Sequence, residues 1–184
     1  LCGACLADPP PFARARAPFA YGGPARQLVL TLKHGRRLHL ARMMARAMLR
    51  VADDLPEDAV IVPVPSHRWR LWQRGFNQAA AIARQLARQS GRPLAVDAIE
   101  RIKPTPTTKG LGRRARQKNV AGAFRVVRPD QIRGRIVVLV DDVMTTGATV
   151  SACTAKLVKA GARQVEVLTY AHALREGQGN MTRV

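Results

Sequence analysis

The chain has 184 residues, a length that suits one compact domain with a small appendage. Its composition, with 47% hydrophobic and 23% charged residues, excludes a largely disordered protein, and no apolar run approaches the roughly 20 residues that a membrane-spanning helix needs. Lysine and arginine number 31 against 12 acidic residues, and the resulting net charge of +19 favours polyanionic partners (nucleic acid, an acidic membrane or phosphate-rich small molecules) unless most of the excess is solvated arginine.

Residues 1–18 show neither helical nor strand periodicity, and we expect a tail or the remnant of a small module, separate from a domain over residues 19–184. Cys2 and Cys5 have the spacing of half a zinc knuckle, but tetrahedral zinc needs four ligands and no second pair follows. The pair is therefore either part of a zinc site or an empty dithiol. With Cys153 the chain has 3 cysteines and no visible secretory signal, which favours a reducing cytoplasm.

Strand and helix patterns alternate through residues 19–184. Short apolar runs bounded by turn residues predict strands at residues 19–21, 59–62, 94–99, 136–140 and 165–170. Periodicity near 3.6 predicts helices at residues 24–35, 40–51, 76–90 and 150–158. This alternation indicates an α/β fold with a mainly parallel sheet and flanking helices.

Residues 101–124 interrupt this pattern with interleaved proline, glycine, lysine and arginine. We expect a long basic loop here, and long loops in compact domains are often functional.

The most informative stretch is the predicted strand 136–140 together with the residues that follow it. Asp141 and Asp142 stand at the carboxyl end of this strand, where open α/β sheets bind ligands. A turn rich in hydroxyls and glycine then opens a helix, whose first N–H groups and dipole attract anions. The residues of this turn are Met144, Thr145, Thr146, Gly147, Ala148 and Thr149.

Carboxylates repel phosphate, so the two acids need a different partner on the same ligand. The vicinal hydroxyls of a ribose fit, because an ionised carboxylate only accepts hydrogen bonds. The sequence therefore predicts a site for a ribose 5-phosphate group, with hydroxyls on Asp141 and Asp142 and phosphate in the turn. Two simpler interpretations stay open: the acids bind a divalent cation directly, or the turn only caps a helix.

This strand, acid pair and Thr-Thr-Gly turn resemble the signature of the type I phosphoribosyltransferases. The resemblance implies the fold of that family and 5-phosphoribosyl 1-pyrophosphate (PRPP) as ligand, with Asp141 and Asp142 on the ribose hydroxyls and Thr145–Thr149 on the 5-phosphate. Some purine-using members have a third acid, a general base, two positions before the glycine. Here that position is Thr145, so a base must come from elsewhere or the acceptor needs none.

Two further stretches narrow the resemblance to the ComF competence-protein family: residues 62–67 followed by 74–78, and residues 111–124. It implies a pyrophosphate-binding turn formed by Val64, Ser66, His67 and Arg68, although the prolines there also fit a simple rigid turn. Arg74 and Asn77 are expected to contact PRPP or the acceptor; alternatively, Asn77 caps a helix. Members of the family also carry an N-terminal zinc ribbon, of which Cys2 and Cys5 would be a remnant.

The basic loop then corresponds to the flexible hood of the family, and Arg113, Arg116 and Lys118 are the residues expected to neutralise charge on the leaving pyrophosphate, with Mg²⁺ bound to PRPP. The competing interpretation of this loop is contact with nucleic-acid phosphates. The resemblance thus implies phosphoribosyl transfer to a nitrogen acceptor and a link to DNA uptake. The alternatives are a regulator that binds PRPP without turnover and an accessory of the competence machinery that binds single-stranded DNA.

Overall fold

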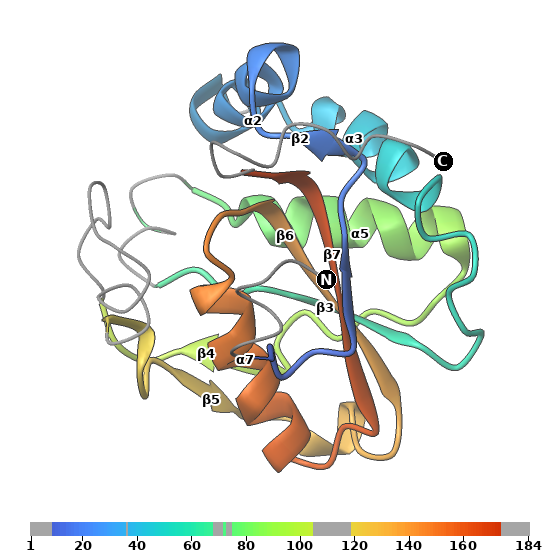
Figure 1. Cartoon of the computed structure of the whole chain (residues 1–184), viewed down its shortest axis with the longest axis vertical. Helices are drawn as coiled ribbons and strands as arrows, with labels where there is room; N and C mark the ends of the chain where they lie inside the picture. Colours follow the sequence, from blue (N-terminus) through green and yellow to red (C-terminus); the bar gives the residue numbers. More distant parts are fainter. Residues whose placement is uncertain (1–8, 36, 68–71, 73–74, 105–118, 174–184) are drawn as a thin grey trace.

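The computed structural model describes residues 9–35, 37–67, 72, 75–104 and 119–173, and a five-stranded parallel sheet is its centre (Figure 1). The strand order is β1-β7-β6-β3, and a further short strand, β2, also pairs with β7. The long central strands are β6 (Ile136–Met144) and β7 (Gln164–His172), and β3 (Val60–Pro63) flanks β6. The strands β1 (Arg14–Arg16) and β2 (Phe19–Ala20) follow each other along the outer edge of β7.

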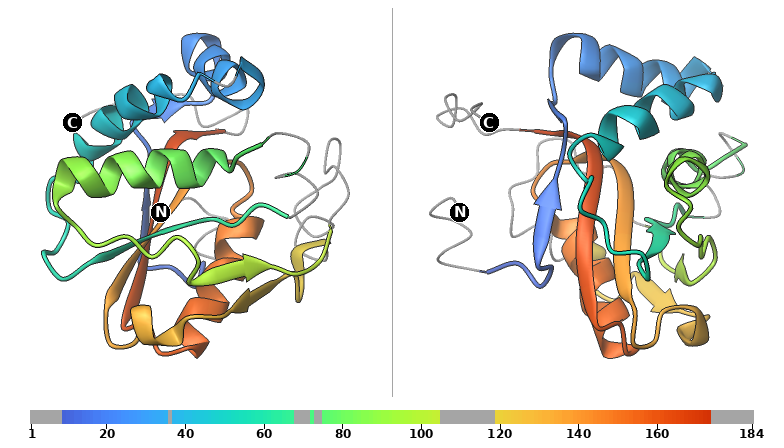
Figure 2. Two further views of the ribbon diagram at one scale, coloured as in Figure 1. Left: turned by 180° about the vertical axis from the view of Figure 1, so that it is seen from behind. Right: turned by 90° about the vertical axis from the view of Figure 1, so that its right-hand side faces the viewer.

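Helices cover both faces of this sheet, as the side view in Figure 2 shows. One face packs against α2 (Gly23–Gly35), α3 (His39–Leu49) and α5 (Gln78–Ser90). The other face packs against α7 (Ala148–Lys159) and against a separate two-stranded antiparallel sheet. Because both faces are buried, the central strands are apolar at successive positions rather than at alternate ones.

The small antiparallel sheet joins β4 (Ile99–Arg101) to β5 (Phe124–Val126). Between them lies most of the predicted basic loop, and its residues 105–118 are outside the described part of the chain. The turn η1 (Pro129–Gln131) then leads into β6. Within the described ranges, no helix has both the length and the apolar character needed to cross a membrane.

The predicted α/β fold with a mainly parallel sheet is confirmed, and two local predictions are wrong. Residues 94–99 do not form a sheet strand: Leu94 makes a single bridge with Ile61, and the strand β4 begins only at Ile99. Arg14–Arg16, expected within a tail, form β1. The strand is short and carries two arginines, so its own sequence gives no strand signal.

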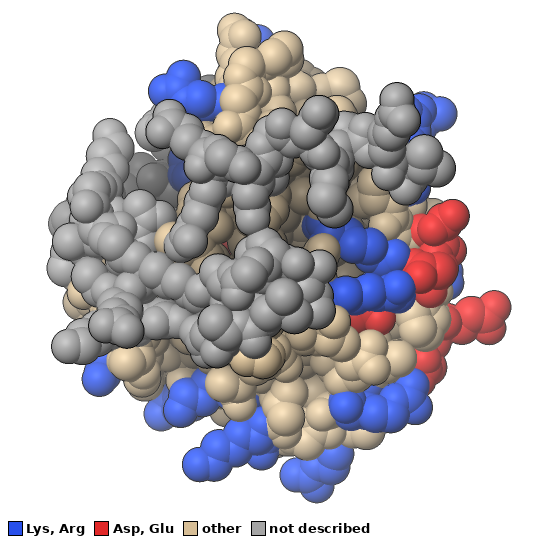
Figure 3. Space-filling model, viewed as in Figure 1, with Lys and Arg blue, Asp and Glu red and all other residues tan. Residues whose placement is uncertain are grey.

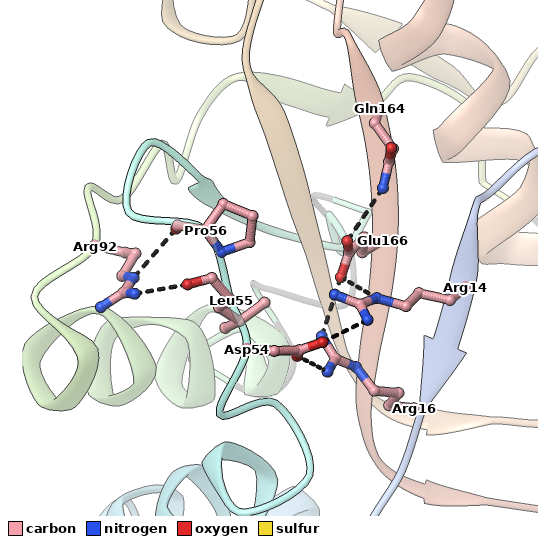
Figure 4. A network of polar contacts seen from close by, with 8 residues as sticks. All are labelled: Arg14, Arg16, Asp54, Leu55, Pro56, Arg92, Gln164 and Glu166. Carbon is pink, nitrogen blue, oxygen red and sulfur yellow. Dashed lines mark hydrogen bonds and ion pairs between the residues drawn. The ribbon is translucent and has the colours of Figure 1, made fainter.

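Buried charge explains why β1 stays on the sheet edge (Figure 4). Glu166 of β7 is 3% exposed, and its Oε2 accepts hydrogen bonds from Arg14 Nε at 2.7 Å and from Arg16 at 3.0 Å. Both arginines also donate to Asp54, which lies before β3. Burial of a carboxylate is tolerated only with such partners, so the arginines of β1 and the acid of β7 require each other.

Candidate functional site

The two acids predicted from the sequence lie within the last part of β6, before its end at Met144. Strand geometry directs them to opposite faces of the sheet, because successive side chains alternate. Val137 and Leu139 pack into the core beneath α7, so Asp141 belongs to that side; Val138 and Val140 pack beneath α2, α3 and α5, which places Asp142 on the other side.

Asp141 lies in a small cavity with the turn that follows β6. The cavity has a volume of about 60 Å³ and is lined by Asp141, Val120 and residues 143–150. A buried water needs at least about 10–15 Å³ of such volume, so the space holds a group of a few heavy atoms, the scale of a phosphate. The structure thus brings together Asp141 and the six turn residues that the sequence assigned to a ribose phosphate.

The start of α7 supplies the donors of this cavity. Gly147 precedes the helix with a φ of 77°, the left-handed conformation that glycine adopts without a steric penalty, and it provides no side-chain cap. The helix ladder begins where Ser151 N–H donates to the Gly147 carbonyl at 2.8 Å. The N–H groups of residues 148–150 precede this bond, and such amides at a helix start together with the helix dipole favour an anion.

Burial strongly perturbs the acid of this cavity. Desolvation raises the pKa of Asp141 well above its usual value, the neighbouring Asp142 raises it further, and the positive charge of Lys33 opposes the shift. Asp142 N–H also donates to Asp141 Oδ1 at 2.9 Å. Burial and a neighbouring negative charge are the two causes that disfavour an ionised carboxylate, and both act on Asp141.

Asp142 does not line that cavity; its partners are different. Its Oδ1 accepts from Val143 N–H at 2.8 Å, and its Oδ2 lies 3.6 Å from the ammonium of Lys33 in α2. From the sequence, Lys33 belongs to a basic segment, residues 33–37, that resembles a segment of the ComF family and is expected to bring charge near the site, unless it is only the basic end of a helix. Its contact with Asp142 was not predicted, since α2 and β6 are far apart in the chain.

His172 is a second residue that sequence reasoning missed. It ends β7 opposite Met144 of β6, and its ring hydrogen-bonds the backbone of Thr145. Burial lowers the pKa of His172, although this bond acts in the opposite direction. The side chain of His172 therefore stabilises the backbone of the phosphate turn at Thr145. It reaches that turn because β7 pairs with β6.

The predicted pyrophosphate turn follows β3 and needs one correction. Val64 N–H donates to the Val140 carbonyl at 2.8 Å, so this amide is already used and is no pyrophosphate donor in this structure. Ser66 and His67 are half-buried at the next positions, and Arg68 lies outside the described residues.

Asn77 serves as the N-cap of α5. Its side chain accepts from Ala79 N–H and donates to the Val64 carbonyl, each at 3.0 Å. The capping alternative of the sequence analysis is thus realised, and the cap ties α5 to the predicted pyrophosphate turn. Next to it, the buried amide nitrogen of Gln78 has no hydrogen-bond partner among the described residues, an uncommon state for a buried donor.

A groove of about 760 Å³ opens beside this turn. It runs between the turn, the first half of α5 and the β4–β5 sheet, and Ser66, Phe76, Arg84 and Glu100 are among its lining residues. The predicted residues Arg74, Arg113, Arg116, Lys118, Cys2 and Cys5 lie outside the described part of the chain. In the part that is described, no cluster of three or more His, Cys, Asp or Glu side chains forms a metal site.

Comparison with known proteins identifies the family. The phosphoribosyl transferase domain matches residues 72–180, more than half of the chain. The DNA utilization protein YhgH of Salmonella typhi is 38% identical over 172 residues, which cover 90% of this chain and 75% of that protein. Competence protein F of Haemophilus influenzae is 33% identical over 181 residues, 94% of this chain and 78% of that protein.

Among solved structures, the allosteric regulatory enzyme of purine biosynthesis aligns with 25% identity and a TM-score of 0.45. The match covers 70% of this chain but only 25% of that enzyme. A glutamine PRPP amidotransferase from B. subtilis aligns with 22% identity and a TM-score of 0.46, over 69% of this chain and 25% of that enzyme. Together, the domain match and the two relatives show that the chain belongs to the phosphoribosyl transferase domain family, within the group that contains competence protein F and YhgH.

Proposed function

We propose that this protein binds PRPP and transfers its phosphoribosyl group to a nitrogen acceptor, with release of pyrophosphate. The observation that carries the proposal is the cavity in which Asp141 faces the start of α7, which no side chain of the described ranges caps. An acid for sugar hydroxyls and amides for a phosphate are the two recognition elements that a ribose 5-phosphate requires.

In this proposal the 5-phosphate binds the turn 145–149, and the ribose lies across the end of β6 near Asp141 and Asp142. The pyrophosphate then extends toward Ser66 and His67, with Arg68, Arg113, Arg116 and Lys118 as further cationic or amide donors. Mg²⁺, which prefers phosphate oxygens and water, enters with PRPP on its pyrophosphate. The zinc site at Cys2 and Cys5 stays a prediction, as does a cytoplasmic location.

The reaction would form one bond and break one at the anomeric carbon of the ribose. The lone pair of the acceptor nitrogen forms the new bond to C1 while the bond from C1 to the pyrophosphate oxygen breaks, and its electrons leave with the pyrophosphate. Positive charge develops on the sugar and negative charge on the leaving group, so fixed donors around the pyrophosphate stabilise the transition state. The acceptor loses a proton, and Thr145 cannot accept it as an acid at that position would.

Calorimetry with PRPP and Mg²⁺ tests the binding step. Wild type should bind, and Asp142→Asn, which removes the ionised acceptor for a hydroxyl, should bind at least about tenfold more weakly. Asp130→Asn in the exposed turn η1 is the matched control and should bind like wild type. Equal affinity of Asp142→Asn and wild type, or no binding by wild type, would contradict the proposal.

Turnover needs a second measurement, namely pyrophosphate release from PRPP over a panel of nitrogenous bases and amines. Release with one acceptor class identifies a transferase. PRPP binding without release from any of them indicates the regulatory alternative, in which the same site only senses the ligand.

A second activity, binding of single-stranded DNA, is favoured by the charge of +19 and by exposed arginines on two neighbouring helices. We define the basic face as the exposed arginines of two helices in contact, α3 and α5, with the residue that follows α3: Arg42, Arg46, Arg50, Arg84 and Arg88. The helices also share a hydrogen bond from Gln89 Nε2 to the Arg42 carbonyl at 3.2 Å. The names of the relatives, a DNA utilization protein and a competence protein, agree with a nucleic-acid partner.

A further inference from the structure

The ion pair between Lys33 and Asp142 is a feature of the site that the proposed function does not use. Lys33 Nζ lies 3.6 Å from Asp142 Oδ2, and the two side chains are 30% and 13% exposed. For such a partly buried pair, the cost of taking both charges out of water offsets much of their attraction, so stability alone gives a weak reason for its presence.

Packing of α2 explains why Lys33 reaches this place. Ala25, Val29 and Leu32 are buried against α3 and the sheet, at positions i, i+4 and i+7 of the helix. Lys33 continues this face at i+8. The apolar positions fix the helix, and the next side chain on the same face extends to the carboxyl end of β6.

Asp142 is consequently held at both oxygens. Val143 N–H donates to Oδ1 at 2.8 Å and Lys33 approaches Oδ2. Each carboxylate oxygen has two lone pairs, so Asp142 retains acceptor capacity for a ligand hydroxyl. A hydroxyl at this point would donate a hydrogen bond to the carboxylate of Asp142 and accept one from the ammonium of Lys33. The protein would then recognise the hydroxyl both as donor and as acceptor.

We propose that Lys33 is a specificity residue of the site, which, together with Asp142, selects sugars that carry both vicinal hydroxyls over deoxy sugars. The inference rests on the proposed binding of a ribose 5-phosphate group. A site built around a hydroxyl disfavours a ligand that lacks it, because the polar groups of the protein then lose their partner. Lys33 contacts Asp142, the acid proposed to bind the sugar hydroxyls. It does so from α2, which lies on the opposite side of β6 from the phosphate cavity.

The test compares ribose 5-phosphate with 2-deoxyribose 5-phosphate and 3-deoxyribose 5-phosphate by calorimetry. Wild type should prefer ribose 5-phosphate to at least one deoxy sugar by about tenfold or more. Lys33→Met should lose most of that preference, by weakening ribose 5-phosphate while leaving the disfavoured deoxy sugar within about twofold. Lys33→Arg, which keeps the charge and donors, should restore part of it.

Lys159→Met is the matched control. It removes the same side chain from the exposed last turn of α7, roughly 16 Å along the helix axis from the phosphate turn at 1.5 Å per residue. Its preference should equal that of wild type. A melting curve for each variant establishes whether Lys33→Met is folded. If it is not, the comparison uses Lys33→Arg, Asp142→Asn and the double variant that combines them. The effects of these two substitutions on the sugar preference should be non-additive.

The outcomes separate this inference from the proposed function. If wild type binds neither ribose 5-phosphate nor PRPP, the proposed function is wrong and the inference falls with it. If wild type binds with the expected preference and Lys33→Met keeps that preference, only the role of Lys33 is wrong. A loss of equal size for all three sugars and for inorganic phosphate would show that Lys33 merely attracts anions, which also overturns the inference.

Discussion

Gly147 is the residue on which the phosphate turn depends. Its φ of 77° lies in the left-handed region, and among the described residues a Cβ there would meet only Ser151 Oγ, at 3.9 Å, an ordinary contact. A substitution is therefore disfavoured by backbone conformation and not by crowding. The strain of a non-glycine residue in this region is about 1–2 kcal/mol.

Gly147→Ala should lower the free energy of unfolding by about 1 kcal/mol and weaken PRPP or ribose 5-phosphate binding, because relaxing the strain moves the first amides of α7. Gly134→Ala is a matched control: its φ is 70°, and no atom of the described part of the chain lies within 4 Å of the added Cβ. Urea unfolding should show similar losses for both, and calorimetry should show weaker binding only for Gly147→Ala. Equal affinity of Gly147→Ala and Gly134→Ala for the ligand would show that the turn is not part of the ligand site.

At this scale, sequence proximity decides what could be predicted. Asp141 and Thr145–Thr149 are neighbours in the chain, and the structure gathers them in one cavity. Lys33 and His172 reach the same region from α2 and β7. The basic segment 33–37 indicates charge near the site but not the contact with Asp142, and no local pattern marks His172. The sequence also treated Asp141 and Asp142 as one pair, whereas strand alternation gives them different faces and different partners.

Among the elements, β1 shows how tertiary contacts override local sequence. An arginine-rich triplet has weak strand propensity, and its position on the edge of β7 follows from Glu166 and Asp54. The central strands were predictable because a strand buried on two faces shows a continuous apolar run in the sequence, and the helices because burial of one face gives a period near 3.6. An edge strand held by ion pairs shows neither pattern in the sequence.

Hydrogen bonds from Arg16 and Arg14 lower the pKa of Asp54 from 3.8 to about 2. Because this pKa is depressed in the folded protein, the stabilisation is present above pH 3.8 and is lost as the pH falls toward 2. Asp54→Asn should therefore be less stable than wild type at pH 7, and the difference should shrink as the pH falls from about 4 to 3. Urea unfolding at several pH values measures this difference.

Asp53→Asn provides the control for this prediction, since Asp53 is exposed beside Asp54 and has no part in the ion-pair network. It removes the same charge from the same turn and should lower stability at pH 7 by less than Asp54→Asn does. A gap between Asp54→Asn and wild type that stays constant down to pH 3 would contradict the role of the ionised carboxylate in holding β1.

For the molecule as a whole, charge is distributed unevenly. Lysine and arginine surround the face in Figure 3, while aspartate and glutamate gather toward one edge of that view. The total of +19 was evident from the sequence, but its arrangement was not, because helix packing decides which arginines become neighbours. The basic face arises where α3 and α5 lie side by side.

If the basic face binds single-stranded DNA, affinity should depend steeply on salt, because each phosphate contact releases a counterion. The slope of log K against log salt should be about −0.7 for each contact. Fluorescence anisotropy with an oligothymidylate between about 50 and 200 mM salt measures it. Replacing Arg42, Arg46 and Arg88 by glutamine should weaken binding and reduce the magnitude of the slope by about two.

The control replaces three exposed arginines away from the basic face, Arg128, Arg133 and Arg163, by glutamine and so removes the same net charge. If only total charge attracts DNA, both triple variants lose affinity alike; if the basic face is the binding surface, its variant loses more. A shallow slope for wild type, or an equal loss for the two variants, would leave the arginines of α3 and α5 as solvated surface and the ligand cavity at β6 as the site that defines the function.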